Sequence, residues 1–347
     1  SVSLRTYLRF RQQMEKLNEH GIHVFLSYGN HDPIREDHQT VQWPDNVTVF
    51  TNETVTSETY TNLSGQVVNI YGFSYTKKVI SSNKSHEYIK TGHADYHIAM
   101  LHGHAEGQSG HDPYAPFSVQ ELVNQPFDYW ALGHIHKRQT LAMNPPVVYP
   151  GNIQGMHQQE QGEKGCVLVT LSKKAPPVIT FVPTANIVWF EEEIDITHIE
   201  TLDVLLQVIN ERKERYRKQS TFLLLRFVGS GSLHEILQSA NERDDLLWAV
   251  NEGEDEQYPF VWIVDMNVHT IGDWDREQLE QRGDFIGELL TTINECEDVD
   301  EAVSNLFKNR YLRSYIHAFS ESEKLYTRKC YFLRDVWSRK SRRIKRF

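Results

Sequence analysis

Three short turns carry the residues of this sequence that could bind a metal ion. Each follows a strand-like apolar run and places glycine beside histidine or asparagine: Gly29-Asn30-His31-Asp32, His102-Gly103 and Gly133-His134-Ile135-His136. Loops at the carboxyl ends of strands in such sheets converge on one crevice, so these side chains are expected to meet there. Neutral imidazoles and amide oxygens are good ligands for Mn, Fe or Zn. We therefore predict a metal site that draws its ligands from these three turns.

The spacing within these turns favours chemistry over ordinary loop structure. In an extended Gly-His-x-His segment the rings of His134 and His136 point the same way, so one turn can supply two ligands. Glycine lets the backbone turn sharply and lets a substrate phosphate approach closely. A single loop histidine, such as His102 taken alone, is often just a hydrogen-bonded residue, but three such turns in succession favour a functional site.

The segments around the turns predict alternating strands and helices. Apolar runs of strand length occur at 22–28, 67–73, 96–101 and 127–132, whereas 4–20 and 118–125 have the pattern of helices. Two later runs, 166–171 and 178–182, are expected to form a hairpin. The sequence thus predicts an α/β (α+β) fold with two packed sheets flanked by helices.

The pattern of predicted helices and strands changes near residues 183–187. Beyond this point come helical stretches at 200–218, 232–250 and 276–296, and strand-like runs at 221–228 and 260–268. The length of 347 residues suits two domains. We place the boundary at about residue 190, with residues 1–189 holding the turns and residues 190–347 forming a second, smaller α+β domain.

Composition and charge argue against several classes of protein. A hydrophobic content of 39% can fill a sizeable core, and no apolar run is long enough to span a membrane. Cys166, Cys296 and Cys330 lie far apart, which predicts reduced thiols in a cytoplasmic protein. The net charge of -11 disfavours indiscriminate binding of nucleic acid over the whole surface. Residues 324–347 are an exception, with ten Lys or Arg against one acidic residue.

Four motifs in order resemble those of a known enzyme family. Gly29-Asn-His-Asp32, Leu101-His-Gly103, Gly133-His-Ile-His136 and Tyr149-Pro-Gly-Asn152 look like the later motifs of calcineurin-like metallophosphoesterases. The resemblance covers about residues 1–185 and is strongest to the DNA-repair exonuclease branch, the bacterial SbcD/YhaO type. His111-Asp-Pro-Tyr-Ala-Pro-Phe117 and Gly162-Glu-Lys-Gly-Cys166 strengthen it. The order of the motifs is specific for the family and less specific for the substrate.

The resemblance implies a role for each residue of the turns. Asn30, His102 and His134 would bind one divalent ion and His136 the other, with Mn²⁺ as the expected metal. The two ions, about 3.5–4 Å apart, would share a hydroxide that attacks phosphorus in line. His31 would lie beside the scissile phosphate and protonate the leaving oxygen. The implied function is that of an exonuclease in DNA repair, with endonuclease activity left open.

The same resemblance implies partners. Nucleases of this family work beside a large coiled-coil ATPase subunit of the SbcC type, which could supply positive surface that this acidic chain lacks. The second domain would then cap the active-site cleft and select the shape of the DNA. Basic segments at Lys77-Lys78, 212–218 and 324–347 are the candidates for DNA contact, although the last of these suits the ATPase or plain solvation equally well. A homodimer is left open, and no membrane partner is expected.

The sequence departs from the family pattern before Gly29. The family's Asp-x-His and Gly-Asp-x-x-Asp turns, which furnish most ligands of one metal and the bridging carboxylate, do not occur there. We therefore expect an N-terminal segment of roughly 50–70 residues to precede Ser1, the length of one strand-helix-strand unit. In its absence we expect negligible catalysis and at most one weakly held ion.

Several residues beside the motifs have two interpretations. Arg138 is placed either to meet a phosphate or to face solvent, and Asp32 either orients a neighbour or caps the turn before Pro33. Three further histidines either support the ligands from behind or are plain surface and structural residues: His104, His111 and His157.

Two other functions compete with the nuclease. One is a phosphodiesterase of a small substrate, such as a cyclic nucleotide or a nucleotide-linked lipid, which the large acidic second domain disfavours. The other is a scaffold that binds DNA ends or an ATPase without cleavage. The missing carboxylate turns favour the scaffold, whereas the intact later motifs oppose it.

Overall fold

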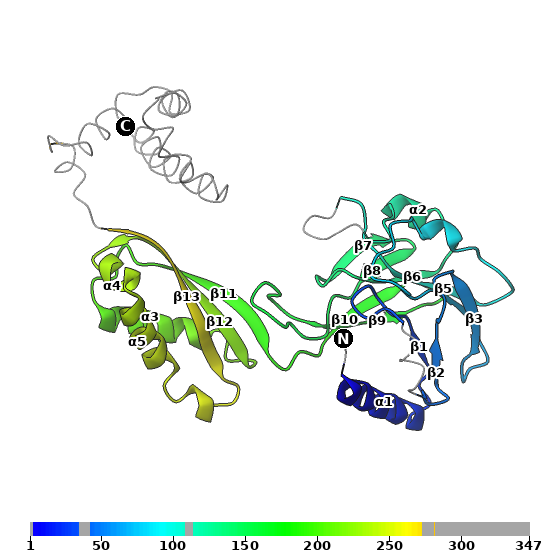
Figure 1. The fold of residues 1–347 in the computed structure, drawn as a ribbon, viewed down its shortest axis with the longest axis horizontal. Coiled ribbons are helices and arrows are strands. Elements are labelled where there is room, and N and C mark those ends of the chain that lie inside the picture. Colours follow the sequence, from blue (N-terminus) through cyan, green and yellow to red (C-terminus); the bar gives the residue numbers. More distant parts are fainter. Residues whose placement is uncertain (1–2, 35–41, 108–113, 273–280, 282–347) are drawn as a thin grey trace. The chain divides into compact units, whose positions relative to one another are not determined.

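The computed structural model describes residues 3–34, 42–107 and 114–272, and residue 281. Residues 1–272 form one compact unit, while the predicted helix at 276–296 and the basic segment at 324–347 lie outside the described residues. Within the described ranges, no helix is both long and apolar enough to cross a lipid bilayer. The predicted α/β class is confirmed by a multistranded sheet with flanking helices (Figure 1).

A six-stranded sheet forms the centre of the first part of the chain. Its strands lie in the order β3, β4, β5, β6, β8 and β7, with the bounds Thr56–Thr61, Val67–Gly72, Tyr96–His102, Tyr129–Gly133, Pro146–Tyr149 and Gln139–Met143. The four inner strands are parallel to one another, and the outer strands β3 and β7 are antiparallel to their neighbours. The runs predicted as strands at 67–73, 96–101 and 127–132 correspond to β4, β5 and β6.

Aromatic side chains dominate the core of this part. Strand β5 alternates between buried and partly exposed positions, as expected for a strand with one better-covered face. The short helix α2 (Val119–Val123) begins with the predicted capping serine, Ser118, whose hydroxyl accepts from the backbone of Glu121 while the Glu121 carboxylate accepts from the backbone of Ser118. The largest fully buried side chains of this core are Trp130, Tyr71, Tyr75, Tyr149, Phe73 and Phe117.

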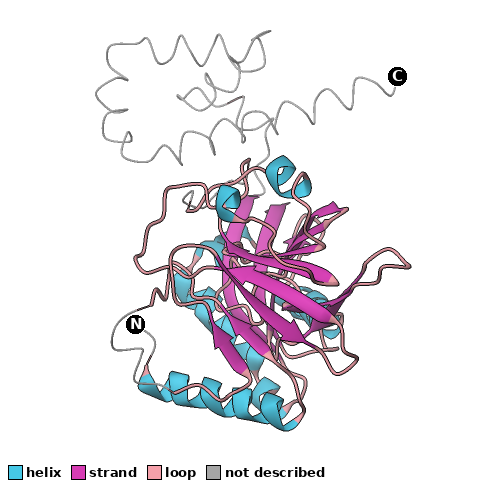
Figure 2. Ribbon diagram, turned by 90° about the vertical axis from the view of Figure 1, so that its right-hand side faces the viewer, coloured by secondary structure: helices cyan, strands magenta, loops and turns pink. Residues whose placement is uncertain are grey.

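Two pairs of strands and a helix complete the first part. β1 (Val24–Leu26) pairs in parallel with β2 (Val47–Val49), and β9 (Gly165–Thr170) forms the predicted antiparallel hairpin with β10 (Val178–Pro183). The helix α1 (Leu4–Glu19) lies outside the strands (Figures 1 and 2). Asn46 ties it to them, because its side-chain amide donates to the carbonyl oxygens of Met14 and Ile22.

Residues 188–272 form a parallel three-stranded sheet with its own hydrophobic core. The strands are β11 (Val188–Asp195), β12 (Thr221–Gly231) and β13 (Val261–Gly272), and the helices are α3 (Leu202–Glu214), α4 (His234–Gln238) and α5 (Ala240–Asn251). The single helix predicted at 232–250 is interrupted at Ser239, which caps α5. β11 was not expected, because the run Glu191–Glu193 interrupts its apolar pattern, and the predicted boundary near residue 190 falls inside this strand.

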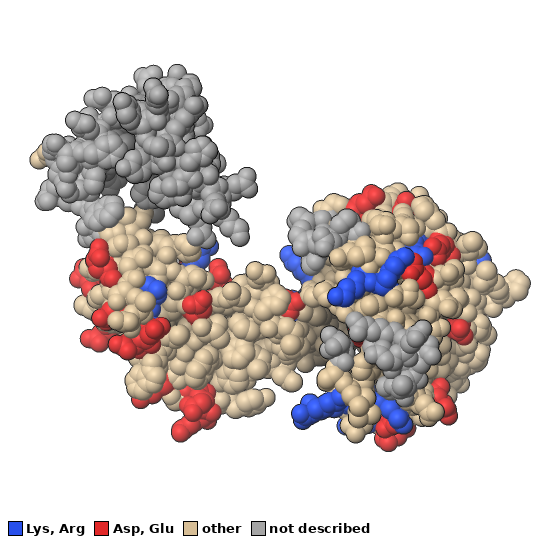
Figure 3. Space-filling view, in the orientation of Figure 1, with Lys and Arg blue, Asp and Glu red and all other residues tan. Residues whose placement is uncertain are grey.

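The two parts of the described chain differ in charge. Residues 188–272 contain 17 Asp or Glu against 7 Lys or Arg, whereas residues 1–187 contain 16 against 14. Figure 3 shows acidic side chains gathered over residues 188–272, with few basic ones between them. This part therefore repels phosphate, while the first part is close to balance.

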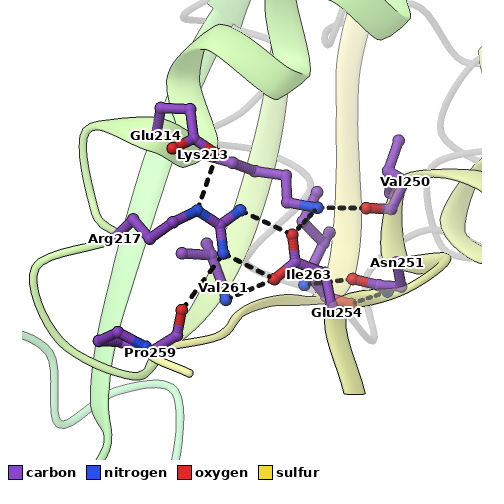
Figure 4. Close-up of polar contacts among 9 residues, drawn as sticks. All are labelled: Lys213, Glu214, Arg217, Val250, Asn251, Glu254, Pro259, Val261 and Ile263. Carbon is purple, nitrogen blue, oxygen red and sulfur yellow. Dashed lines mark hydrogen bonds and ion pairs between the residues drawn. The ribbon is translucent and has the colours of Figure 1, made fainter. Parts of the chain in front are cut away.

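A buried ion cluster joins α3 to the chain between α5 and β13 (Figure 4). The Glu254 carboxylate, only 3% exposed, lies 2.7 Å from Lys213 Nζ and 2.8 Å from Arg217 Nη2, and it accepts from the backbone N–H of Val261 at 2.9 Å. Burial alone would raise the pKa of Glu254. The hydrogen bonds from Arg217, Lys213 and Val261 outweigh it and hold that pKa at about 2, below the usual 4.5.

Replacing Glu254 with glutamine should lower the free energy of unfolding at neutral pH by about 3 kcal/mol, because Lys213 stays buried without its counter-charge. Since the folded state depresses the Glu254 pKa, its stabilisation is complete above about pH 4.5 and is lost as the pH falls toward 2. The difference between wild type and Glu254→Gln in chemical denaturation should therefore shrink over that interval. Glu214→Gln, at an exposed partner of Arg217, is the control and should cost less than about 0.5 kcal/mol. Equal stability of Glu254→Gln and wild type at neutral pH would show that Glu254 is not the counter-charge that Lys213 requires.

Candidate metal centre

Strands of two sheets bring the three turns of the sequence together. β5 ends at His102 and β6 ends at Gly133, and these residues face each other in the parallel register. The carboxyl ends of neighbouring parallel strands share one edge of a sheet, so His102 and the turn after Gly133 lie at the same edge. The third turn follows β1, and its Asn30 reaches His102. Side chains from separate parts of the chain thus meet at this edge.

Asn30 and His102 are in direct contact. Asn30 Oδ1 lies 2.8 Å from His102 Nε2, and Asn30 is only 6% exposed. Two ligands that each lie about 2.1 Å from one ion, at a right angle, are about 3 Å apart. Asn30 Oδ1 only accepts, so His102 Nε2 carries the proton in this hydrogen bond. The same distance also suits two ligands of a single divalent ion, which would take the place of that proton.

The ring of His102 is held between two glycines. A Cβ atom at Gly29 would lie 2.8 Å from His102 Nε2, and one at Gly133 would lie 2.9 Å from His102 Nδ1. Real Cβ atoms essentially never approach so closely, so both positions require glycine while the ring keeps its place. The Tyr75 hydroxyl fixes the same strand end by donating to the His102 carbonyl oxygen at 3.0 Å. The position of the ring is thus set mainly by backbone atoms.

The surroundings of His102 keep its ring neutral. Its pKa lies at about 3, first because the ring is buried and then because His134, His31 and His136 are near enough to repel its charge. A neutral imidazole offers the lone pair that a metal ion needs. The same repulsion shows that the four histidines of the motifs lie in one region.

His134 occupies a strained backbone position. Its φ of 99° is a value that a residue with a side chain rarely adopts. Its ring centroid lies 5.4 Å from that of His102, 5.7 Å from that of Tyr114 and 6.1 Å from that of His104. Strain of this kind persists where the surroundings over-determine it and is common at functional sites. The position of His134 thus depends on several neighbouring rings.

His136, the last of the predicted ligands, contacts a residue that the sequence did not indicate. Its Nδ1 lies 2.5 Å from Oε1 of Glu160, which is buried in the loop after β8. No motif marks Glu160, which lies between glutamines, and no spacing rule connects it to His136. Contact in space is the only signal that could have found it.

The other residues of the first turn point in two directions. His31 is exposed, as a residue that meets substrate must be. Asp32 instead accepts a hydrogen bond from the Tyr7 hydroxyl at 3.2 Å and so anchors the turn to α1. Of its two interpretations, the structure favours the orienting contact.

The structure describes three of the four residues beside the later motifs that have two interpretations. The Arg138 guanidinium lies 3.8 Å from the centroid of the Phe181 ring, a stacked position that leaves its planar edge for other contacts. His104 is buried beside His134, which excludes a plain surface residue and leaves the supporting and structural interpretations. His157 is exposed, and His111 lies outside the described residues.

The donors present suit part of a metal site. Asn30 Oδ1 and the neutral His102 ring meet at a ligand-to-ligand distance, with His134 and His136 in the same region. Among the described residues, no three His, Cys, Asp or Glu side chains are arranged to enclose an ion by themselves. The contact between the asparagine and His102 is therefore the core of the arrangement.

The sequence profile of the calcineurin-like phosphoesterase family matches residues 5–138. The chain is also 33% identical over 324 residues to the uncharacterized metallophosphoesterase YhaO of Bacillus subtilis (strain 168), in an alignment that covers 92% of this chain and 78% of YhaO. The chain belongs to the calcineurin-like metallophosphoesterases. This metallophosphoesterase is therefore a hydrolase of phosphoesters, from a family that typically uses divalent metal ions.

A second relative lies further away. Over 209 residues the metallophosphoesterase is 26% identical to the DNA double-strand break repair protein Mre11 of Methanocaldococcus jannaschii. That alignment covers 56% of this chain and 49% of Mre11, so the match spans about half the length of that relative.

Replacing Gly29 with alanine should displace the His102 ring and separate it from Asn30, because the new Cβ would overlap the ring. We expect the affinity for Mn²⁺ to fall by about 10-fold or more, the usual effect of disturbing the support of a ligand. Gly231→Ala, in β12, is the control, since its nearest contact, the Ile196 carbonyl oxygen at 3.2 Å, is tight but belongs to none of the predicted ligands. Titration of Mn²⁺ followed by electron paramagnetic resonance measures both variants. Wild-type affinity in Gly29→Ala would refute this account of the site.

Proposed function

We propose that this metallophosphoesterase hydrolyses the phosphodiester bonds of DNA, as an exonuclease that acts at DNA ends, with endonuclease activity left open. The observation that carries the proposal is the contact of Asn30 with His102 beside the exposed His31. The similarity to the repair protein Mre11 supports DNA as the substrate class. The amide oxygen of Asn30 and the lack of a thiolate among the predicted ligands suit Mn²⁺, which is the metal we propose.

A bound divalent ion would supply Lewis acidity and a water of lowered pKa. The residues of the chain position the reaction. Asn30 and His102 would hold one side of the site, and the neutral ring of His102 has a single proton on Nε2 to lose when an ion takes its place. To His31, exposed on the turn next to Asn30, we assign the role of facing the scissile phosphate and giving a proton to the leaving oxygen. His134 and His136 complete the donor set from the end of β6.

The distribution of charge bears on where DNA can bind. A duplex is held mainly through its phosphates, so it needs a locally positive surface. The excess of acidic residues in 188–272 opposes this, whereas residues 1–187 are nearly balanced. We therefore propose that DNA contacts the first part of the chain, and that a coiled-coil ATPase partner adds positive surface.

Two assays with Mn²⁺ test the proposal on the full-length protein. Labelled linear duplex and single-stranded DNA are compared with a simple aryl phosphodiester. Cleavage of DNA supports the nuclease. Cleavage of the aryl ester alone would replace it with a small-substrate phosphodiesterase, and DNA binding without any cleavage would replace it with a scaffold.

Replacing His31 with alanine should lower kcat on DNA by about 100-fold or more, because the leaving oxygen loses its proton donor. The Mn²⁺ content should stay near that of the wild type, since His31 is not among the predicted ligands. His20→Ala, at an exposed histidine at the end of α1, is the control and should leave both quantities unchanged. Parallel loss of kcat and Mn²⁺ in His31→Ala would show that this histidine is a ligand and not the proton donor.

A further inference from the structure

A buried carboxylate stands behind one of the proposed ligands. Glu160 Oε1 lies 2.5 Å from His136 Nδ1, and the side chain of Glu160 is 7% exposed whereas that of His136 is 49% exposed. A carboxylate is strongly hydrated, so burying one is costly unless hydrogen bonds replace the lost water. The surroundings of Glu160 should therefore supply such bonds.

Both oxygens of the Glu160 carboxylate are hydrogen-bonded. Oε2 accepts from the backbone N–H of Met156 at 2.8 Å, and the Asn152 side chain also hydrogen-bonds the carboxylate. His157 Nε2 lies 3.7 Å from Oε1, on the exposed side. These hydrogen bonds replace the water that burial removes, and they hold the Glu160 carboxylate in one orientation.

The position of the contact on the ring decides what it can do. An ionised carboxylate only accepts hydrogen bonds, so the nitrogen facing it must carry the proton. In a neutral ring this leaves the lone pair on Nε2, on the far side from Glu160. The charge-assisted bond also restricts rotation of a side chain that is half exposed.

We propose that Glu160 is a positioning residue, which fixes His136 in its Nδ1–H form and directs Nε2 toward a metal ion. The inference rests on the proposed function, because it takes His136 as a ligand. The competing interpretation is that Glu160 only stabilises the loop of residues 152–160, through its hydrogen bonds with Met156 and Asn152.

The loop interpretation and the positioning role predict different results for Glu160→Gln. Glutamine keeps the shape but has one acceptor oxygen in place of two, so it cannot accept from both His136 and Met156. The positioning role predicts that the affinity for Mn²⁺ at one site falls by about 10- to 100-fold, with the thermal midpoint little changed. Glu163→Gln, at an exposed glutamate three residues away, is the matched control and should bind Mn²⁺ as the wild type does. A lower thermal midpoint with unchanged Mn²⁺ affinity would overturn the proposal in favour of the loop interpretation.

A second measurement does not need the metal. The ¹⁵N chemical shifts of the His136 ring in the metal-free wild type should report the Nδ1–H form, and those of Glu160→Gln a shift toward the Nε2–H form. An Nε2–H ring in the wild type would overturn the proposal even if the variant failed to fold. If the wild type shows the Nδ1–H form but binds no Mn²⁺, the proposed function fails while the hydrogen bond to Glu160 stands, so the two failures are distinguishable.

Discussion

The ring of His102, wedged between the backbones of Gly29 and Gly133, is the interaction on which the site depends. Gly29 belongs to the turn after β1, and Gly133 ends β6, so the ring joins two hydrogen-bonded units that share no strand pairing. Asn30 reaches the ring because no side chain keeps its turn at a distance. Backbone packing, which is stiffer than a contact between two flexible side chains, therefore sets the spacing of the donors.

Electrostatics in the same region favour a metal ion over a proton. Burial and mutual repulsion both oppose a positive charge on His102, so its ring remains neutral across the physiological range. A divalent ion can take up the lone pairs of several neutral rings at once, whereas several protonated rings would repel one another. The crowding of His31, His134 and His136 around His102 is thus a cost for protonation and an advantage for coordination.

The sequence predicted the parts of this arrangement that local patterns encode. Glycine beside histidine at the ends of apolar runs marked the three turns, and the capping serine marked α2. Strand β11 was not predicted, because three glutamates interrupt its pattern of apolar residues. One of them faces α3 and the other two face solvent. The role of Glu160 could not be predicted, because it depends on a contact with a residue 24 positions away in the sequence, and no periodic pattern indicates such a contact. The assignment of metal ligands and the domain boundary near residue 190 stay predictions.

Different interactions hold the proposed ligands His102 and His136 in place, because one ring is buried and the other is half exposed. His102 is buried between the backbones of Gly29 and Gly133 and is hydrogen-bonded to Asn30, so close packing and a neutral partner hold its ring. His136 is half exposed, so water competes for its nitrogens and packing alone cannot hold it. An ionised carboxylate is the partner that outcompetes water for the ring N–H, provided that the carboxylate is itself dry and fixed. Glu160 meets both conditions through its burial and its hydrogen bond from Met156. A charged partner therefore restricts the exposed ring of His136, whereas close packing restricts the buried ring of His102.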